Sequence, residues 1–226
     1  MKNIVVLTGA GISAESGIKT FRDADGLWEG YDVMEVASPQ GWQKNPKLVL
    51  QFYNDRRRQL SEVHPNAAHK ALVQLEEQYH VTIITQNVDD LHERAGSSHV
   101  VHLHGELLKA RSQKNPDEVI PCTNDINYGD TCKYGQQLRP HIVWFGEEVP
   151  MLETAISLTE KADILIIIGT SMQVYPAANL VHYVTPGIPK YFVDPAPAIT
   201  DKSIQVIAKK ASLGVPELVT KLLEHV

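Results

Sequence analysis

The chain has 226 residues, a length that one α/β domain can reach, with 43% hydrophobic residues, 21% charged residues and a net charge of −6. This composition is ordinary for a folded globular protein that buries a sizeable core. The negative net charge disfavours binding to nucleic acids or to anionic membranes, which requires a basic surface, so neither is an expected partner.

The chain begins with an apolar run at residues 4–7, which Thr8 and Gly9 end. This run is shorter than the ~7–15 apolar residues of a secretory signal, so it predicts a buried first strand. No apolar stretch approaches the roughly 20 residues that span a bilayer. The two cysteines, Cys122 and Cys132, make no disulfide framework and favour a reducing, cytoplasmic location.

Short apolar runs alternate with helical patterns along the chain. The near-continuous hydrophobicity of these runs predicts strands that are covered on both faces, as in a parallel sheet. The expected strands are 4–7, 81–84, 100–103, 142–145, 164–168 and 191–193. Helices are expected over 67–79 and at Pro46 and Pro216, because proline suits a first helical turn. The alternation predicts an α/β fold with a doubly wound, parallel, Rossmann-like sheet.

Two segments depart from this alternation within what is expected to be a single domain, 1–226. Residues 22–62 hold a loop and one helix where a simple βαβ unit would already have returned to the sheet. Residues 107–141 are polar, show little strand pattern and contain both cysteines. We expect the first segment to be a helical insertion and the second to form a small lobe.

A glycine-rich turn, GAGISA at residues 9–14, directly follows the first expected strand. Glycines there let backbone N–H groups approach a pyrophosphate at a helix N-terminus. The usual dinucleotide fingerprint also needs an acidic residue that ends a second strand about 20 positions later. Here residues 23–28 read DADGLW with no strand before them. An ordinary dehydrogenase is therefore disfavoured.

Four motifs lie at the expected carboxyl ends of strands, where open α/β sheets bind ligands. They are GAGISAESGIKTFRDADGLW (9–28), QNVDDLHERAG (86–96), LHGEL (103–107) and GTSMQVYPAA (169–178). In this order the motifs resemble those of the sirtuin family, and the resemblance covers nearly the whole chain. It implies an enzyme that consumes NAD to remove acyl groups from protein lysine, releasing nicotinamide and O-acyl-ADP-ribose.

The resemblance also implies which residues bind NAD. Around the dinucleotide and its reactive ribose it implies Gly9, Ala10, Gly11, Thr20, Phe21, Arg22 and Trp28. At the nicotinamide and its ribose it implies Gln86, Asn87 and Asp89, and at the adenosine half Gly169, Thr170, Ser171 and Ala211. Asp194 stands where the family usually has asparagine, and a carboxylate there can still accept from ribose hydroxyls.

His104, in LHGEL, matches the catalytic base of the family. The resemblance implies that the acyl-lysine carbonyl oxygen attacks the anomeric carbon as nicotinamide leaves, and that His104 deprotonates a ribose hydroxyl. Histidine suits this role because its ordinary pKa of about 6.5 is close to neutral pH. A lone histidine is more often structural, and His102 lies on the same strand, but the motif favours His104.

The substrate chain is expected to bind by strand addition, in which main-chain hydrogen bonds supply the affinity. The family segments that sandwich such a peptide match Val143, Phe145 and Gly146 on one side and Val174 and Tyr175 on the other. The alternative, that this segment is plain core strand, is the expectation for Ile142 and Trp144.

Most sirtuins hold a structural zinc ion through four cysteines, whereas this chain has only Cys122 and Cys132. A structural zinc site needs four tetrahedral ligands, and the spacing of Asp130 and His141 fits no such pattern. We therefore expect no metal, free thiols, and a small lobe that packing and hydrogen bonds stabilise.

A helix expected over 46–63 carries the basic run of residues 56–58, which on its own reads as a solvated helix face. At about 100° per residue, Arg56 falls on the apolar stripe between Phe52 and Leu60, while the next two arginines point away from it. An inward arginine needs an anionic partner, because an unpaired buried charge is costly. An internal salt bridge or a guanidinium that reaches solvent is the alternative.

The spacing of Tyr53 and Arg56 resembles the tyrosine–arginine pair of the desuccinylase-like sirtuins, and Ala37 resembles the small residue that widens their acyl pocket. This resemblance implies a preference for succinyl or malonyl groups, with acetyl removal retained. Arginine can hold a carboxylate through two parallel hydrogen bonds, and tyrosine can add a hydroxyl donor.

Two other functions remain open from the sequence. A mono-ADP-ribosyltransferase would use the same NAD cleavage with another nucleophile, and an NAD-responsive binding module would use none. The presence of His104, Asn87 and Asp89 disfavours the binding module, which has no need of a base. Nicotinamide release that depends on acyl-lysine would indicate the deacylase.

Overall fold

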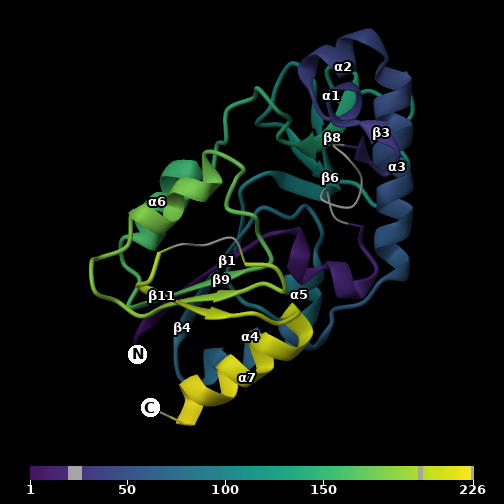
Figure 1. Cartoon of the computed structure of the whole chain (residues 1–226). Coiled ribbons are helices and arrows are strands. Elements are labelled where there is room, and N and C mark those ends of the chain that lie inside the picture. Colours follow the sequence, from purple (N-terminus) through teal and green to yellow (C-terminus); the bar gives the residue numbers. More distant parts are fainter. Residues whose placement is uncertain (20–26, 198–200, 225–226) are drawn as a thin grey trace.

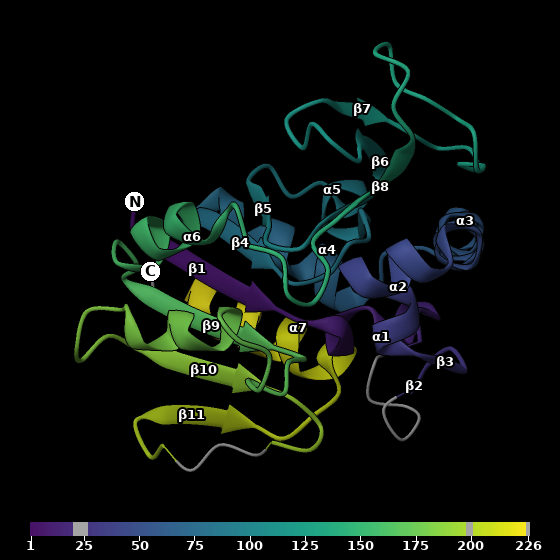
Figure 2. The same cartoon turned by 90° about the horizontal axis from the view of Figure 1, so that it is seen from above.

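The computed structural model describes residues 1–19, 27–197 and 201–224. Its main sheet has six parallel strands in the order β11-β10-β9-β1-β4-β5. In chain order these are β1 (Asn3–Thr8), β4 (His80–Thr85), β5 (Val100–His102), β9 (Ile164–Ile168), β10 (Lys190–Val193) and β11 (Ile204–Ile207). The chain winds outward from β1 in both directions, so the predicted doubly wound α/β fold is confirmed (Figure 2).

Both faces of this sheet are covered, which explains the continuous hydrophobicity of its strands. Helices α4 (Ala67–Gln74), α5 (Leu91–Ala95) and α7 (Ala211–Glu224) and the 3-10 turn η3 (Leu75–Glu77) lie on one side; α6 (Leu152–Thr159) and η4 (Ala177–His182) lie on the other (Figure 1). Ile4 and Val6 of β1 pack with the α4–α7 core, whereas Val5 and Leu7 pack with the opposite core.

The rest of the chain gathers beyond the carboxyl ends of the central strands (Figure 1). Its antiparallel sheet has the order β7-β6-β8. The elements here are η1 (Ala10–Ile12), η2 (Ala14–Ser16), β2 (Leu27–Trp28), β3 (Tyr31–Asp32), α1 (Val33–Val36), α2 (Pro39–Lys44), α3 (Pro46–Glu62), β6 (Gly105–Ser112), β7 (Val119–Pro121) and β8 (Leu138–Ile142). We refer to β6, β7, β8 and the loops between them as the small lobe.

Three expectations about the elements are wrong. The strand expected at 142–145 is instead β8, which ends at Ile142 and belongs to the antiparallel sheet. Strands β6 and β11 were not expected, because charged or polar residues interrupt both. Pro216 lies inside α7 rather than at its start.

Helix α7 begins earlier than its proline indicates because another part of the chain supplies its cap. The Glu15 carboxylate accepts hydrogen bonds from the backbone N–H and the hydroxyl of Ser212. This satisfies donors of the first turn that no intrahelical carbonyl can reach. Pro46, by contrast, is the first residue of α3, as predicted. Within the described ranges, no helix is long and apolar enough to cross a membrane.

Candidate functional site

The parallel sheet brings the four motif loops together at the carboxyl ends of its strands. In the sheet register Thr8 lies beside Thr85 and Ile168, and Thr85 lies beside His102. The loops that follow β1, β4, β5 and β9 therefore start next to one another, although they are far apart in sequence.

Glycines allow the first and last of these loops to pack backbone against backbone. The N–H of Gly11 donates to the carbonyl of Gly169 at 2.8 Å. A Cβ atom on Gly11 would lie 2.6 Å from the Gly169 Cα, and one on Gly169 would lie 2.4 Å from the Ile12 nitrogen. Gly169 also has a φ of +59°, which favours glycine. After Gly9, the loop that follows β1 forms two single 3-10 turns, η1 and η2, where the sequence predicted the N-terminus of a helix.

A buried hydrogen-bond network joins the loop after β1 to the loop after β4. The Asn87 amide donates to the Gly9 carbonyl at 3.1 Å and to the Ser13 hydroxyl at 3.2 Å. The Ser13 hydroxyl in turn donates to an Asp89 carboxylate oxygen at 3.0 Å. Ser13 was missed as a site residue, although it lies within the first motif. Its place in that motif was the only signal, because the partners lie far along the chain.

Burial changes the acidity of Asp89, which is 6% exposed. Burial raises the pKa of the Asp89 carboxyl to about 6, against the opposing effect of hydrogen bonds from Leu91 N–H and from Ser13. Near neutral pH this carboxyl can therefore accept a hydrogen bond or, when protonated, donate one. A carboxamide, with one acceptor and two donors, is a chemically matching partner.

His104 follows β5 with its tautomer fixed by the backbone. Its Nδ1 lies 3.1 Å from the Gln86 carbonyl, which can only accept, so Nδ1 carries the proton and Nε2 the lone pair. The described residues offer Nε2 no hydrogen-bond partner. Burial lowers the pKa of His104 below its usual 6.5, and the Gln86 carbonyl partly offsets this. The ring is thus neutral and can take a proton at neutral pH.

His102 is a structural residue by the same criteria. One ring nitrogen lies 3.1 Å from the Asn87 carbonyl and the other lies 2.7 Å from the Glu93 carboxylate. Burial opposes the protonation of His102, but Glu93 raises its pKa above the ordinary value. Neither nitrogen is available to a substrate, so the geometry favours His104 as the base.

The predicted adenosine side lies at the ends of β9 and β10. Thr170 is buried, and its hydroxyl accepts from the Gln86 amide at 3.1 Å. Ser171 is partly exposed next to it. Asp194 is 2% exposed and follows β10, where its carboxylate accepts from the Ala196 N–H. Ala211 is the first residue of α7 and is buried in the core between the sheet and helices α4 and α7. The predictions for Thr20, Phe21 and Arg22 lie outside the described residues.

Comparisons with known proteins agree with this arrangement of motifs. The family model described as Sir2 family matches residues 9–176. The chain belongs to the Sir2 family. An NAD-dependent protein deacylase of Helicobacter pylori is 61% identical over 226 residues, covering 99% of both chains.

Solved Sir2 structures share the fold. A Sir2 homologue in complex with NAD has a TM-score of 0.90 and 40% identity, covering 99% of this chain and 90% of that one. A Sir2 protein bound to an acetylated peptide has a TM-score of 0.78 and 28% identity, with coverages of 98% and 92%. Both alignments span nearly the whole of this chain.

The small lobe departs from the zinc-binding form that most sirtuins have. Cys132 is buried, while Cys122 is partly exposed and donates its S–H to the Asn124 carbonyl. In the part of the chain that the structure describes, no group of three or more His, Cys, Asp or Glu side chains could hold a metal ion. The residues present do not fit a zinc ion.

A charged cluster connects the strands of the small lobe instead. Glu147 accepts two hydrogen bonds from the Arg139 guanidinium, at 2.7 and 3.0 Å, one from Arg111 at 3.1 Å and one from the Trp144 N–H at 2.9 Å. Arg139 also lies over the Trp144 ring, 3.2 Å from its centroid. Burial would raise the pKa of Glu147, but Arg139 and the Trp144 N–H lower it below its usual range.

The residues predicted to bind the peptide differ in burial and in their backbone contacts. Val143 donates its N–H to the His104 carbonyl, and Phe145 donates to the Ala37 carbonyl, both at 2.9 Å. Phe145 is 43% exposed, whereas Trp144 between them is buried. Gly146, Val174 and Tyr175 are exposed or partly exposed. The segment 143–145 is therefore hydrogen-bonded to His104 at one end and to Ala37 at the other.

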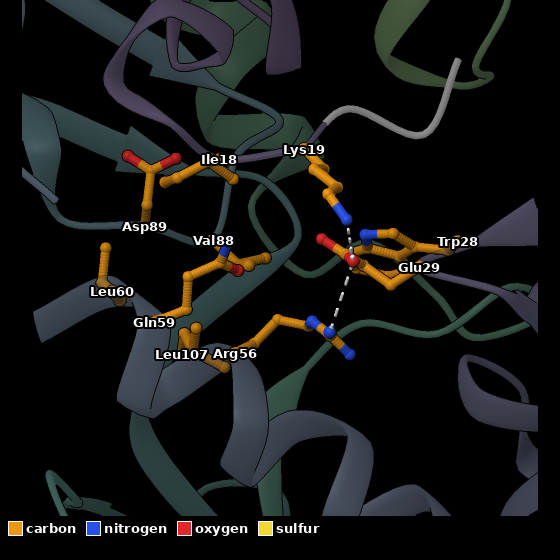
Figure 3. A pocket seen from close by; sticks show the side chains of 10 residues that line it. All are labelled: Ile18, Lys19, Trp28, Glu29, Arg56, Gln59, Leu60, Val88, Asp89 and Leu107. Carbon is orange, nitrogen blue, oxygen red and sulfur yellow. Dashed lines mark hydrogen bonds and ion pairs between the residues drawn. The ribbon is translucent and has the colours of Figure 1, made fainter. Parts of the chain in front are cut away.

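Arg56 lines a pocket together with Asp89, Trp28 and Leu107 (Figure 3). Its side chain is 15% exposed, and its NH1 donates to the Phe52 carbonyl at 3.0 Å. The prediction that Arg56 faces inward is confirmed.

Tyr53 and Arg57, which lie close to Arg56 on helix α3, do not line this pocket. The Tyr53 hydroxyl is buried and accepts from the Trp144 indole at 3.1 Å, so it does not line this pocket, and direct contact of Tyr53 with the acyl group stays a prediction. Arg57 was expected on a solvated face but is 2% exposed. It donates to the Leu107 carbonyl and to Asn54, which joins α3 to β6.

Proposed function

We propose that this chain is an NAD-dependent lysine deacylase that favours acyl groups with a terminal carboxylate, such as succinyl and malonyl. Membership of the Sir2 family and the relatives named NAD-dependent protein deacylase support the deacylase activity. The neighbour bound to an acetylated peptide supports a protein substrate. The position of Arg56 supports the acyl preference.

The residues of the site suit the steps of such a reaction. Bound NAD would supply the electrophilic ribose carbon. Asp89, Asn87 and Ser13 are linked in one buried network, which holds the loops where the nicotinamide half is expected. His104 presents an unprotonated Nε2, because Gln86 holds the proton on Nδ1. A base of this kind can remove a hydroxyl proton in the transition state.

The single observation that carries the acyl preference is an arginine inside the pocket that Asp89 also lines. An acetyl group offers a guanidinium no charge, whereas a succinyl group ends in a carboxylate that can accept two parallel hydrogen bonds. Bonds of this type contribute about 1.5–3 kcal/mol, or roughly 10- to 150-fold in affinity. Arginine suits this task better than lysine because its donors form a rigid fork.

The Arg56→Met variant tests this preference. We expect kcat/KM for a succinyl-lysine peptide to fall about 10- to 150-fold, because the charge-assisted bonds are lost, and kcat/KM for the acetyl peptide to change far less. Arg58→Met is the matched control on the same helix, since Arg58 is exposed and pairs with Asp55 and Asp125. If Arg56→Met lowers both activities equally, or if the wild type prefers acetyl, the charged-acyl proposal is wrong.

A further inference from the structure

Arg56 has the carboxylate of Glu29 beside it within the pocket that both residues line. The Glu29 Oε2 atom lies 4.0 Å from Arg56 NH2 and 3.1 Å from Lys19 Nζ (Figure 3). We propose that Glu29 is a specificity-determining residue: an internal carboxylate that occupies Arg56 until the acyl carboxylate displaces it, while Lys19 keeps it paired. This inference rests on the proposed function of Arg56.

The backbone at Glu29 indicates that its side chain is placed there for a reason other than the turn. Trp28 pairs with Tyr31, so Glu29 and Gly30 form the two-residue loop of a β-hairpin. Their φ angles are +53° and +83°, as a type I′ turn requires. Asn-Gly and Asp-Gly are the preferred loops of this type, because the short polar side chains of Asn and Asp hydrogen-bond to the local backbone and so offset the strain of a positive φ. Glutamate is thus a poor turn residue, but its longer side chain reaches Arg56.

The contact between Glu29 and Arg56 leaves donors for a second carboxylate. The 4.0 Å separation is longer than the roughly 2.7–2.9 Å of a charge-assisted hydrogen bond. Among the described residues, the buried Nε of Arg56 has no hydrogen-bond partner. NH1 and the stacking of the guanidinium 4.1 Å from the Phe52 ring centre fix the group in position. A substrate carboxylate can therefore form shorter bonds with Arg56 than Glu29 does.

Two carboxylates beside one guanidinium repel each other, so binding of the acyl carboxylate favours displacement of Glu29. Lys19 makes this displacement inexpensive. Its side chain is 67% exposed, whereas that of Glu29 is 13% exposed. A flexible, exposed ammonium can follow the Glu29 carboxylate as it moves, so that no charge is left unpaired in the pocket. An acetyl group has no carboxylate and leaves the Glu29–Arg56 pair in place.

The test measures KM and kcat for succinyl- and acetyl-lysine peptides at saturating NAD. Glu29→Gln removes the competing charge, so we expect a succinyl KM about three- to fivefold lower and a succinyl-to-acetyl kcat/KM ratio higher by the same factor. Lys19→Met leaves Glu29 with Arg56 alone, so the succinyl KM should rise by a similar factor. Glu29→Asn, which suits the turn better, should act like Glu29→Gln and excludes a folding defect.

Double variants separate competition from general charge attraction. If Lys19 acts through Glu29, Lys19→Met has no further effect in the Glu29→Gln chain. If Glu29 acts through Arg56, Glu29→Gln has no further effect in the Arg56→Met chain. An unchanged succinyl-to-acetyl ratio in Glu29→Gln, or effects of equal size in both backgrounds, overturns the inference. If Arg56→Met itself fails to act selectively on succinyl, the proposed function falls and this inference with it.

Discussion

Replacing His104 by alanine should lower kcat for deacylation by about 100- to 10,000-fold, because general-base catalysis contributes that much to a proton-transfer step. NAD affinity should largely survive, since the buried network of Asn87, Ser13 and Asp89 does not include the His104 side chain. Single-turnover rates and NAD titration measure the two quantities separately. His80→Ala is the matched control, because His80 is exposed at the amino-terminal end of β4, at the other end of the strands from His104.

The pH profile of the wild type gives a second view of the same residue. Burial lowers the pKa of His104, so the acid limb of kcat/KM should have its midpoint below the usual 6.5. Loss of the fold at low pH must be separated from titration of His104. Burial also lowers the pKa of His69 to about 4, so the folded state binds fewer protons and loses stability as the pH falls from about 6.5. A thermal melt of the protein at each pH therefore accompanies the rate measurements. Turnover of His104→Ala within about tenfold of wild type would remove His104 from the role of base.

Replacing Glu147 by glutamine should destabilise the fold by about 3 kcal/mol, the low end of the range for removing one partner of a buried ion pair, because Glu147 itself is 21% exposed. The change leaves the guanidinium groups of Arg111 and Arg139, whose side chains are 9% and 7% exposed, without a compensating charge. For a chain of this length the loss corresponds to a melting temperature about 6–12 °C lower. Differential scanning calorimetry measures it.

Glu106→Gln is the matched control in the same lobe, because Glu106 pairs with Lys109 at the surface, where such pairs contribute about 0–1 kcal/mol. The same samples can be heated with and without a chelator. We expect chelation to leave the melting temperature unchanged, whereas a melting temperature that falls with chelator would show that a metal ion stabilises the lobe. Equal stability of Glu147→Gln and wild type would show that the charged cluster does not replace a metal site.

The sequence predicted the main sheet because its strands are buried on both faces, and continuous apolar runs such as Ile164–Ile168 are visible without any partner. The edge strand β11 was missed because Gln205 and Val206 are exposed and the run is not continuous. Strand β6 was missed for a related reason. It carries Glu106, Lys109 and Arg111, and the burial of Arg111 depends on Glu147, which lies far along the chain.

The sequence motifs predicted which loops form the candidate site, but not which side chains within it contact one another. The inward direction of Arg56 followed from helical periodicity alone. The burial of Arg57 did not, because its partners Leu107 and Asn54 are brought to it by the fold. The role of Ser13 likewise depends on Asp89, which the register of β1 and β4 places beside it.

Nicotinamide release distinguishes lysine deacylation from transfer of ADP-ribose to another acceptor. The purified chain is incubated with NAD and one of three peptides that differ only at a single lysine, which is succinylated, acetylated or unmodified. We expect release with both acylated peptides, fastest with the succinylated one, and about one O-acyl-ADP-ribose for each nicotinamide. Release at the same rate with the unmodified peptide would rule out deacylation as the source of nicotinamide and indicate transfer of ADP-ribose to another nucleophile.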